Sequence, residues 1–343
     1  MATVEGPVTK GNEARRKFQP AHQSAGDRPL VIGLVNNMPD SALSTTERQF
    51  RNLLSAASRD NALELRVFYI PEIPRSANGR SYLEEHCEPI RKLWESRIDG
   101  LIVTGTEPRA DRLTDEPYWS TLARLVDWAQ ARGVSAIWSC LAAHAAVFHM
   151  DGIARRRRSE KLSGLFDCVR NHPHPILVGT PERWRVPHSR YNELSEDALI
   201  STGYKILVRS PQAGADTFIR QGNSLFIFFQ GHPEYDPDSL LREYRRDIAR
   251  FVAGERDTYP AMPSGCFDPE TVALLSVFRE RLLSRTGAVL PSFPTERAAS
   301  RLEHVWRGPA VSIYRNWLSL LRCRGAVCVD HADAIVGSAW SRS

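Results

Sequence analysis

The sequence of 343 residues contains no apolar run long enough to cross a bilayer, for which about 20 consecutive apolar residues are needed. It also shows no secretory signal, which would combine a short apolar core with a small-residue cleavage site. We therefore expect a cytoplasmic protein without a membrane partner. Its cysteines should stay reduced, because disulfides are rare in that compartment.

Paired cysteines are also missing. The six cysteines are scattered along the chain, and no two of them form a C-x-x-C pair. Closely spaced cysteines are the usual mark of zinc sites and disulfide frameworks, so we expect no metal and no disulfides. A reduced cysteine that serves neither purpose is available for catalysis.

Positive charge is in slight excess but is not gathered into a nucleic-acid-binding pattern. The net charge is +5, and a run of four arginines at 155–158 supplies much of the excess. No basic stripe with interleaved aromatic residues is present, so we expect no nucleic-acid partner. The run itself has two interpretations, a solvated cationic loop or a contact with substrate phosphates, and short charge runs usually face solvent.

The first half of the chain alternates apolar runs with amphipathic segments. Apolar, β-branched runs predict buried strands, and apolar residues at helical spacing predict helices between them. Strands are expected at 30–35, 63–70, 99–105 and 134–138, with helices at about 44–57, 82–94, 118–129 and from 141. This alternation predicts an α/β fold whose doubly wound, mostly parallel sheet is flanked by helices. Ligands bind such a sheet at the carboxyl ends of its strands.

The pattern changes after residue 151. Short strands, partly antiparallel, are expected after a loop at 161–166 and around 206–208 and 218–219, and an apolar strand at 224–229. Helices are expected at 240–251, at 271–283 and from about 296 to 321, the last interrupted near Gly308 and Pro309. This predicts a disordered leader (1–28), a main domain (29–254), extra C-terminal helices of the same domain (255–322) and a loose tail (323–343).

Cys140 lies where the strand at 134–138 turns into an alanine-rich helical segment. At a helix N-terminus the dipole and the free N–H groups stabilise a thiolate and the oxyanion of an acyl-transfer intermediate. A free cysteine taken alone is more often a buried core residue. Evidence from other residues of the chain is therefore needed to choose between these two interpretations of Cys140.

A second candidate, the stretch Gly231-His232-Pro233-Glu234, directly follows the apolar strand at 224–229. Residues two apart in an extended segment share a face, so His232 and Glu234 can enter one site. A histidine oriented by a carboxylate, near a cysteine at a strand–helix turn, is the nucleophile–base–orienter arrangement of covalent catalysis. A His-Pro-Glu triplet alone is more often a surface turn, and the combination with Cys140 favours an enzyme.

These residues resemble those of known proteins. Cys140 with the later Gly-His-Pro-Glu resembles the Cys-His-Glu pattern of the class I glutamine amidotransferase-like fold. More closely, the chain resembles the homoserine O-acyltransferase family (homoserine O-succinyltransferase) over about residues 29 to 322. The stretches that carry this resemblance are NNMP (36–39), DGLIVTG (99–105), YW (118–119), EKLSGLF (160–166), PHSR (187–190), GHPEY (231–235), EYRRD (243–247) and NWL (316–318).

The resemblance implies an enzyme of methionine biosynthesis that moves a succinyl group from succinyl-CoA to the hydroxyl of L-homoserine. Cys140 would carry the acyl group as a thioester, and His232 would be the general base, oriented by Glu234. The Leu141 N–H would serve the oxyanion. The substrate-binding residues implied by motif position are Lys161, Ser189, Arg190 and Arg246. No permanently bound cofactor is implied, because acyl-CoA is a co-substrate, and a homodimer is left open.

The chain departs from the family pattern at several places, among them the loop after Met38-Pro39, which carries Asp40-Ser41 instead of lysine, and the Gly-Ala-Pro loop, which is Gly105-Thr106-Glu107-Pro108 here. Two further departures bear directly on the reaction. The turn reads Cys140-Leu141-Ala142, where the family usually has Cys-Trp-Gly, and Arg109 stands where glycine accompanies succinyl transfer and glutamate accompanies acetyl transfer. A guanidinium that enters the acyl pocket can pair with a succinyl carboxylate, and one that swings into solvent leaves room for it. We therefore predict succinyl-CoA as the donor.

Other functions stay open. A homoserine or serine O-acetyltransferase would use the same residues with acetyl-CoA. A glutamine amidotransferase would share the Cys-His-Glu set, but such domains normally carry Gly-x-Cys-x-Gly, and here Trp138 and Ala142 flank the turn. A non-catalytic binding protein of the same fold would have an inert Cys140 thiol.

Overall fold

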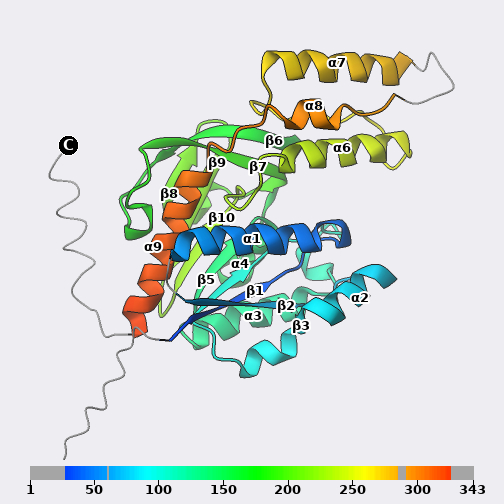
Figure 1. Cartoon of the computed structure of the whole chain (residues 1–343). Coiled ribbons are helices and arrows are strands. Elements are labelled where there is room, and N and C mark those ends of the chain that lie inside the picture. The colour runs from blue at the N-terminus through cyan, green and yellow to red at the C-terminus, as the bar shows by residue number, and fades with distance from the viewer. Residues whose placement is uncertain (1–27, 60–61, 285–290, 326–343) are drawn as a thin grey trace, which may run out of the picture.

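The computed structural model describes residues 28–59, 62–284 and 291–325. One ten-stranded sheet runs through this part of the chain, with the strand order β3-β2-β1-β4-β5-β10-β9-β8-β6-β7 (Figure 1). The predicted leader and tail lie almost wholly outside these residues. Within the described ranges, no helix combines the length and the apolar character that a membrane crossing requires.

One half of the sheet is parallel. Its main strands are β2 (Leu63–Tyr69), β1 (Leu30–Val35), β4 (Gly100–Val103), β5 (Ser135–Ser139) and β10 (Leu225–Phe229). Strands β4, β5 and β10 are buried along their whole length, as strands covered on both faces should be. Because β10 runs parallel to β5, with Phe229 opposite Ser139, the segments that follow both strands emerge at the same edge.

The other half is antiparallel. It consists of β9 (Gly214–Gln221), β8 (Lys205–Ser210), β6 (Arg156–Arg170) and β7 (Arg183–Glu193). The predicted loop at 161–166 is wrong, because these residues lie inside the 15-residue strand β6. The first residues of β6 are charged and largely exposed, so no apolar alternation marks the start of the strand.

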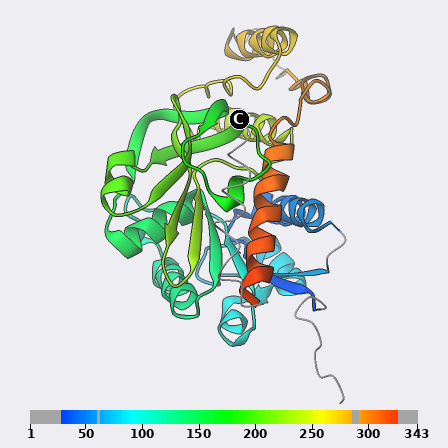
Figure 2. The same ribbon diagram turned by 90° about the vertical axis from the view of Figure 1, so that its left-hand side faces the viewer.

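Helices cover both faces of the sheet. Helices α1 (Leu43–Ser58) and α9 (Arg307–Gly325) pack on one face, and α3 (Trp119–Ala131) and α4 (Leu141–Asp151) pack on the other (Figures 1 and 2). Trp317 of α9 is fully buried in the same core cluster as Ile32 of β1. The end of the described chain therefore completes the core that its first strand begins.

Three further helices form a separate layer. Helix α6 (Ser239–Val252) follows the His-Pro-Glu stretch, and α7 (Pro269–Ser284) and α8 (Thr295–Ala299) lie above it (Figure 1). Tyr244 and Ile248 of α6 pack against Leu275 and Phe278 of α7. This small core holds α6 in place, and α6 supplies residues to the site described below.

Two helix predictions are wrong, both at prolines. The expected helix at 82–94 is instead α2 (Ala77–His86), the two-residue strand β3 (Glu88–Pro89) and the 3-10 turn η2 (Ile90–Glu95), because the residue before a proline avoids helical geometry. The expected break near Gly308 and Pro309 falls earlier, at 300–306. Pro309 lies in the first turn of α9, where a missing N–H costs nothing.

Candidate active site

Cys140 stands at a strained turn between β5 and α4. Its φ of 52° and ψ of −113° lie where non-glycine residues rarely occur, at a cost of about 1–3 kcal/mol. The Cys140 N–H donates to the Phe229 carbonyl at 2.7 Å, and the Cys140 carbonyl accepts from the Ala143 N–H at 3.0 Å. These bonds hold the turn and place the thiol at the carboxyl edge of the sheet, as a nucleophile at a strand–helix turn requires.

His232 and Glu234 reach the same edge from the end of β10. The His232 N–H donates to the Pro187 carbonyl at 2.8 Å, which ties the loop to β7. His232 Nδ1 and Glu234 Oε1 are 2.9 Å apart, and both side chains are nearly buried. Tyr235 stacks on the His232 ring with the centroids 4.2 Å apart. With Nδ1 bonded to Glu234, Nε2 is the ring nitrogen left for the hydrogen bond with Cys140.

The charges around His232 favour its protonated form. Burial lowers the pKa of His232, but the Glu234 carboxylate and a hydrogen bond with Cys140 outweigh burial and raise it well above 6.5. His232 therefore carries a proton at neutral pH, within hydrogen-bonding reach of the thiol. Such a ring can give its proton to a leaving group first and act as a base afterwards.

Gly105, just after β4, keeps an N–H of α4 accessible beside Cys140. The first N–H groups of a helix have no acceptor within the helix, and that of Leu141 is one of them. A Cβ on Gly105 would lie 2.9 Å from the Leu141 nitrogen and 3.0 Å from the Leu141 Cβ. A side chain at position 105 would therefore fill the space from which an oxyanion approaches this N–H.

We expect Gly105→Ala to lower kcat by about 10²–10³-fold, the usual effect of losing one oxyanion donor. The KM should change little, because the oxyanion exists only in the transition state and the intermediate. Steady-state kinetics check this, with Gly222→Ala as the control, since an added Cβ there meets nothing within 4 Å. A Gly105→Ala enzyme with the parental kcat would show that this N–H plays no part.

Lys161, Ser189 and Arg246 gather around two carboxylates of α6. Lys161 Nζ lies 2.8 Å from Asp247 Oδ2 and 3.4 Å from Glu243 Oε2. The Ser189 hydroxyl donates to Glu243, and Arg246 Nη2 lies 3.3 Å from Asp247 Oδ1. The structure thus brings three of the sequence-predicted binding residues into one charged cluster.

Tyr235 connects this cluster to the histidine. Its ring stacks on His232, and its hydroxyl donates to Glu243 at 2.6 Å. Burial raises the pKa of Glu243, but the charge of Lys161 and the hydrogen bonds from Ser189 and Tyr235 outweigh burial and lower it. Glu243 is therefore anionic, and a molecule bound at the cluster lies beside the Cys-His-Glu set.

The other two predicted arginines are placed differently. Arg190 is buried, and its guanidinium donates to the carbonyl of Asn192 at 2.7 Å and to that of Ala213. The side chain of Arg109 is exposed, while its backbone N–H donates to the Glu116 carboxylate. Arg190 thus braces the backbone on the side of the molecule where Cys140 lies, and the outward position of Arg109 is the one that leaves room for an acyl chain.

The four arginines at 155–158 do not share one environment. The last three begin β6, and two of them are exposed. Arg155 is half-buried and forms no ion pair with the residues that the structure describes. Burial lowers the pKa of Arg155, and the charges of Tyr118 and Glu116 oppose that shift. Cys140 acts on this pKa in the same direction, so the guanidinium lies on the side of the molecule where Cys140 lies.

The profile of the homoserine O-succinyltransferase family matches residues 16–324. The chain belongs to this family. It is 46% identical to the homoserine O-succinyltransferase of Methylorubrum extorquens over 301 residues, which cover 88% of this chain and 89% of that protein. It is also 46% identical to the homoserine O-succinyltransferase of Rhodopseudomonas palustris, over 92% of this chain and 95% of that one. The resemblance drawn from the sequence is confirmed.

Solved structures with a similar fold carry other names. A glutamine amidotransferase from Methylobacillus flagellatus has a TM-score of 0.48 and 18% identity, covering 85% of this chain and 94% of that one. A glutamine amidotransferase from Thermotoga maritima has a TM-score of 0.49 and 10% identity, covering 86% and 99%. The predicted fold class is confirmed by the sheet itself, in which most neighbouring strands are parallel and helices cover both faces.

For this member of the homoserine O-succinyltransferase family, the structure gives a place in the site to residues that the sequence analysis had left without a role. Glu243 joins the binding cluster, Gly105 exposes the Leu141 N–H, and Glu116 holds the loop that carries Arg109. A signal for Glu243 existed, because it lies four residues before Asp247 on an amphipathic helix, and residues so spaced share a helix face. The roles of Gly105 and Glu116 depend on contacts between distant segments.

Proposed function

We propose that this protein transfers the succinyl group of succinyl-CoA to the hydroxyl of L-homoserine, through a thioester on Cys140. The observation that carries the proposal is the strained turn at Cys140 with His232 beside it and Glu234 bonded to Nδ1 of the ring. Membership in the homoserine O-succinyltransferase family supports the choice of substrates, and places the reaction in methionine biosynthesis.

In the first half-reaction the Cys140 thiolate attacks the thioester carbonyl of succinyl-CoA. The Leu141 N–H donates to the oxyanion that forms. The bond between the acyl carbon and the CoA sulfur then breaks, and His232 gives its proton to that sulfur. This half-reaction yields free CoA, a succinyl thioester on Cys140 and a neutral imidazole.

In the second half-reaction the neutral His232 takes the proton of the homoserine hydroxyl as that oxygen attacks the thioester. The bond between the acyl carbon and the Cys140 sulfur breaks, and the thiolate leaves beside a histidine that is protonated again. The product is O-succinyl-L-homoserine. Glu234 keeps Nδ1 bonded throughout, so Nε2 exchanges the proton in both halves.

The charges of homoserine suit the cluster on α6. The amino acid brings a carboxylate, which needs cations, and an ammonium, which needs carboxylates. Lys161 and Arg246 supply the cations, and Glu243 and Asp247 supply the carboxylates. A zwitterion that binds here exchanges existing ion pairs for new ones, so no buried charge is left unpaired.

For the succinyl carboxylate we propose Arg155. It is half-buried, lies on the side of Cys140 and pairs with no carboxylate among the described residues. The hydroxyl of Tyr118, another neighbour of this guanidinium, is buried and has no hydrogen-bond partner within the described ranges. A carboxylate placed between the two would satisfy both groups.

We expect Arg155→Ala to lower kcat/KM for succinyl-CoA by about 10–100-fold, because a hydrogen bond to a charged group contributes about 1.5–3 kcal/mol. With acetyl-CoA, which lacks the carboxylate, the loss should be much smaller. The matched control is Arg156→Ala, which removes an exposed arginine of the same run. Equal losses with both donors would contradict this assignment and favour a contact with the CoA phosphates.

The function itself is tested by assaying the purified protein with L-homoserine and each acyl-CoA. Release of CoA and formation of O-succinylhomoserine are the expected results. A preference for acetyl-CoA would overturn the choice of donor. Release of ammonia from glutamine, without any dependence on CoA, would instead identify an amidotransferase.

A further inference from the structure

A second histidine–carboxylate pair lies buried beneath the catalytic loop. Cys168 of β6, His188 of β7 and Asp216 of β9 place one donor atom each within 4.8 Å of one another. The three residues are 0%, 0% and 2% exposed. The reaction proposed above uses none of them.

His188 and Asp216 form a close contact whose geometry is poor for a hydrogen bond. His188 Nε2 and Asp216 Oδ1 are 3.2 Å apart, yet neither atom has a hydrogen-bond partner in the described part of the chain. The distance between the two atoms suits a hydrogen bond, so it is the direction of the ring N–H that is unfavourable. The Nδ1 atom of His188 also lacks a partner within those residues. Buried polar groups are nearly always satisfied, so this cluster calls for a further partner.

We propose that Cys168, His188 and Asp216 bind a divalent metal ion, and that the ion is zinc. Thiolate, imidazole and carboxylate are the ligands that zinc takes in proteins, at about 2.3, 2.0 and 2.0–2.2 Å. Tetrahedral geometry separates such a nitrogen and oxygen by about 3.3 Å. The separation of 3.2 Å between Nε2 and Oδ1 fits that geometry.

The chemistry of the donors suits a metal. A neutral imidazole offers a lone pair, and a cation that binds a thiol displaces its proton. A thiolate and a carboxylate together balance the two charges of the ion.

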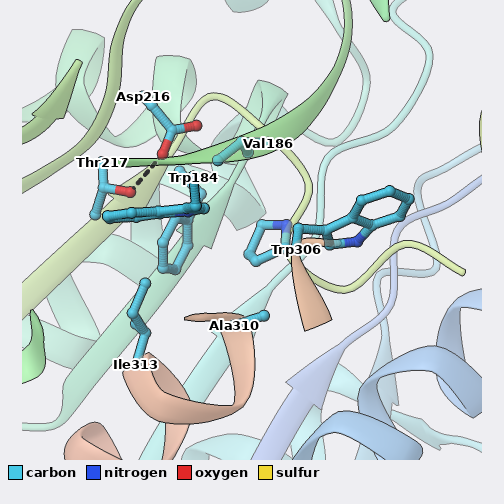
Figure 3. Close-up of a pocket in the computed structure, with 9 residues that line it drawn as sticks. Trp184, Val186, Asp216, Thr217, Trp306, Ala310 and Ile313 are labelled. Atoms are coloured by element: carbon cyan, nitrogen blue, oxygen red, sulfur yellow. Dashed lines mark hydrogen bonds between the residues drawn. The ribbon is translucent and has the colours of Figure 1, made fainter. Parts of the chain in front are cut away.

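A small cavity lies against Asp216, one of the three residues. Its volume is about 10 Å³, room for one water molecule. Figure 3 shows Asp216 beside it, with Trp184 and Val186, which share a face of β7 with His188. The Thr217 hydroxyl donates to the other oxygen of Asp216 at 2.7 Å, which leaves Oδ1 for the ion.

The site lies directly under the loop that carries His232. A Cβ on Gly231 would stand 2.5 Å from Asp216 Oδ1 and 3.0 Å from His188 Nε2, so the loop closes tightly over the pair. The His232 N–H is bonded to Pro187, the neighbour of His188. An ion that joins β6, β7 and β9 therefore fixes the position of this loop. Its role is structural, does not depend on the proposed reaction, and departs from the sequence-based expectation of no metal.

The test begins with the metal content of the full-length wild-type protein, purified without a polyhistidine tag or chelators and measured by plasma mass spectrometry. We expect about one zinc per chain. After removal of the metal, Co²⁺ should bind and give the visible bands of a tetrahedral site and a near-ultraviolet band from the thiolate. A wild-type protein that holds no stoichiometric metal, and whose metal-free form binds no Co²⁺, would overturn the proposal.

Two cysteine variants locate the site. Cys168→Ser should lose the thiolate band and bind Co²⁺ more weakly. Cys87→Ser, the control, removes another buried free thiol far along the sheet order and should keep both properties. An unchanged thiolate band in Cys168→Ser would refute the assignment of ligands. If Cys168→Ser does not fold, the metal content and Co²⁺ spectrum of the wild type decide the question alone.

Discussion

Replacing Cys140 with serine is expected to lower kcat by about 10³–10⁶-fold, the range for loss of a catalytic nucleophile. The reason is that a cysteine attacks as a thiolate, whereas a serine hydroxyl keeps its proton at neutral pH and is a much weaker nucleophile. The fold should persist, because Cys140 is partly exposed and outside the core clusters.

The measurement is steady-state turnover together with a thermal unfolding curve. Cys266→Ser is the matched control, because Cys266 is also a free, partly exposed cysteine. It should keep both activity and unfolding temperature. Undiminished turnover in Cys140→Ser would contradict the assignment of the nucleophile, whereas loss of activity with loss of folding would leave Cys140→Ala as the variant to measure.

Replacing His232 with glutamine should lower kcat by about 10²–10⁴-fold, the usual range for a general acid–base group. Both half-reactions should slow, because His232 delivers the proton in one and removes it in the other. Single-turnover release of CoA and steady-state formation of product measure the two separately. If only one of the two half-reactions slows, the proposal that His232 acts first as an acid and then as a base is wrong.

The Glu234→Gln variant tests whether Glu234 acts on His232 through its charge or only by orienting the ring. The Glu234 carboxylate raises the pKa of His232, so its neutralisation should lower that pKa and move the loss of the ring proton to lower pH. The pH profile of CoA release in a single turnover should shift in the same direction. An unchanged profile would show that Glu234 does not set the charge of His232.

The sequence could predict that Cys140, His232 and Glu234 lie at one edge of the sheet, because parallel strands leave little freedom. Cys140 and His232 each follow a buried apolar strand, and such strands end at one edge of a parallel sheet. The prediction required β5 and β10 to be parallel neighbours, and they are. Along the chain, however, 85 residues separate Leu225 from Ser139, and four antiparallel strands lie in that span. A local sequence pattern does not reveal that two distant strands pair. Only Cys140 and His232 together, each just after a buried strand, indicated that these two strands are neighbours.

Other features depend on contacts that no local pattern records. Lys161 lies inside a strand whose polar start hides its period, and Gly105 matters because of Leu141 on another element. The cluster of Cys168, His188 and Asp216 likewise depends on contacts between distant segments of the chain. The absence of C-x-x-C pairs excludes sites built from closely spaced cysteines, but it does not bear on donors drawn from three different strands.

Mass spectrometry of the intact protein after mixing with succinyl-CoA, before and after addition of L-homoserine, tests the central claim most directly. The wild type should gain the mass of one succinyl group, and peptide mapping should place it on Cys140. L-Homoserine should remove the group and appear as O-succinylhomoserine. A protein that turns over but never carries the group on Cys140, or one whose adduct persists when homoserine is added, would contradict the thioester mechanism.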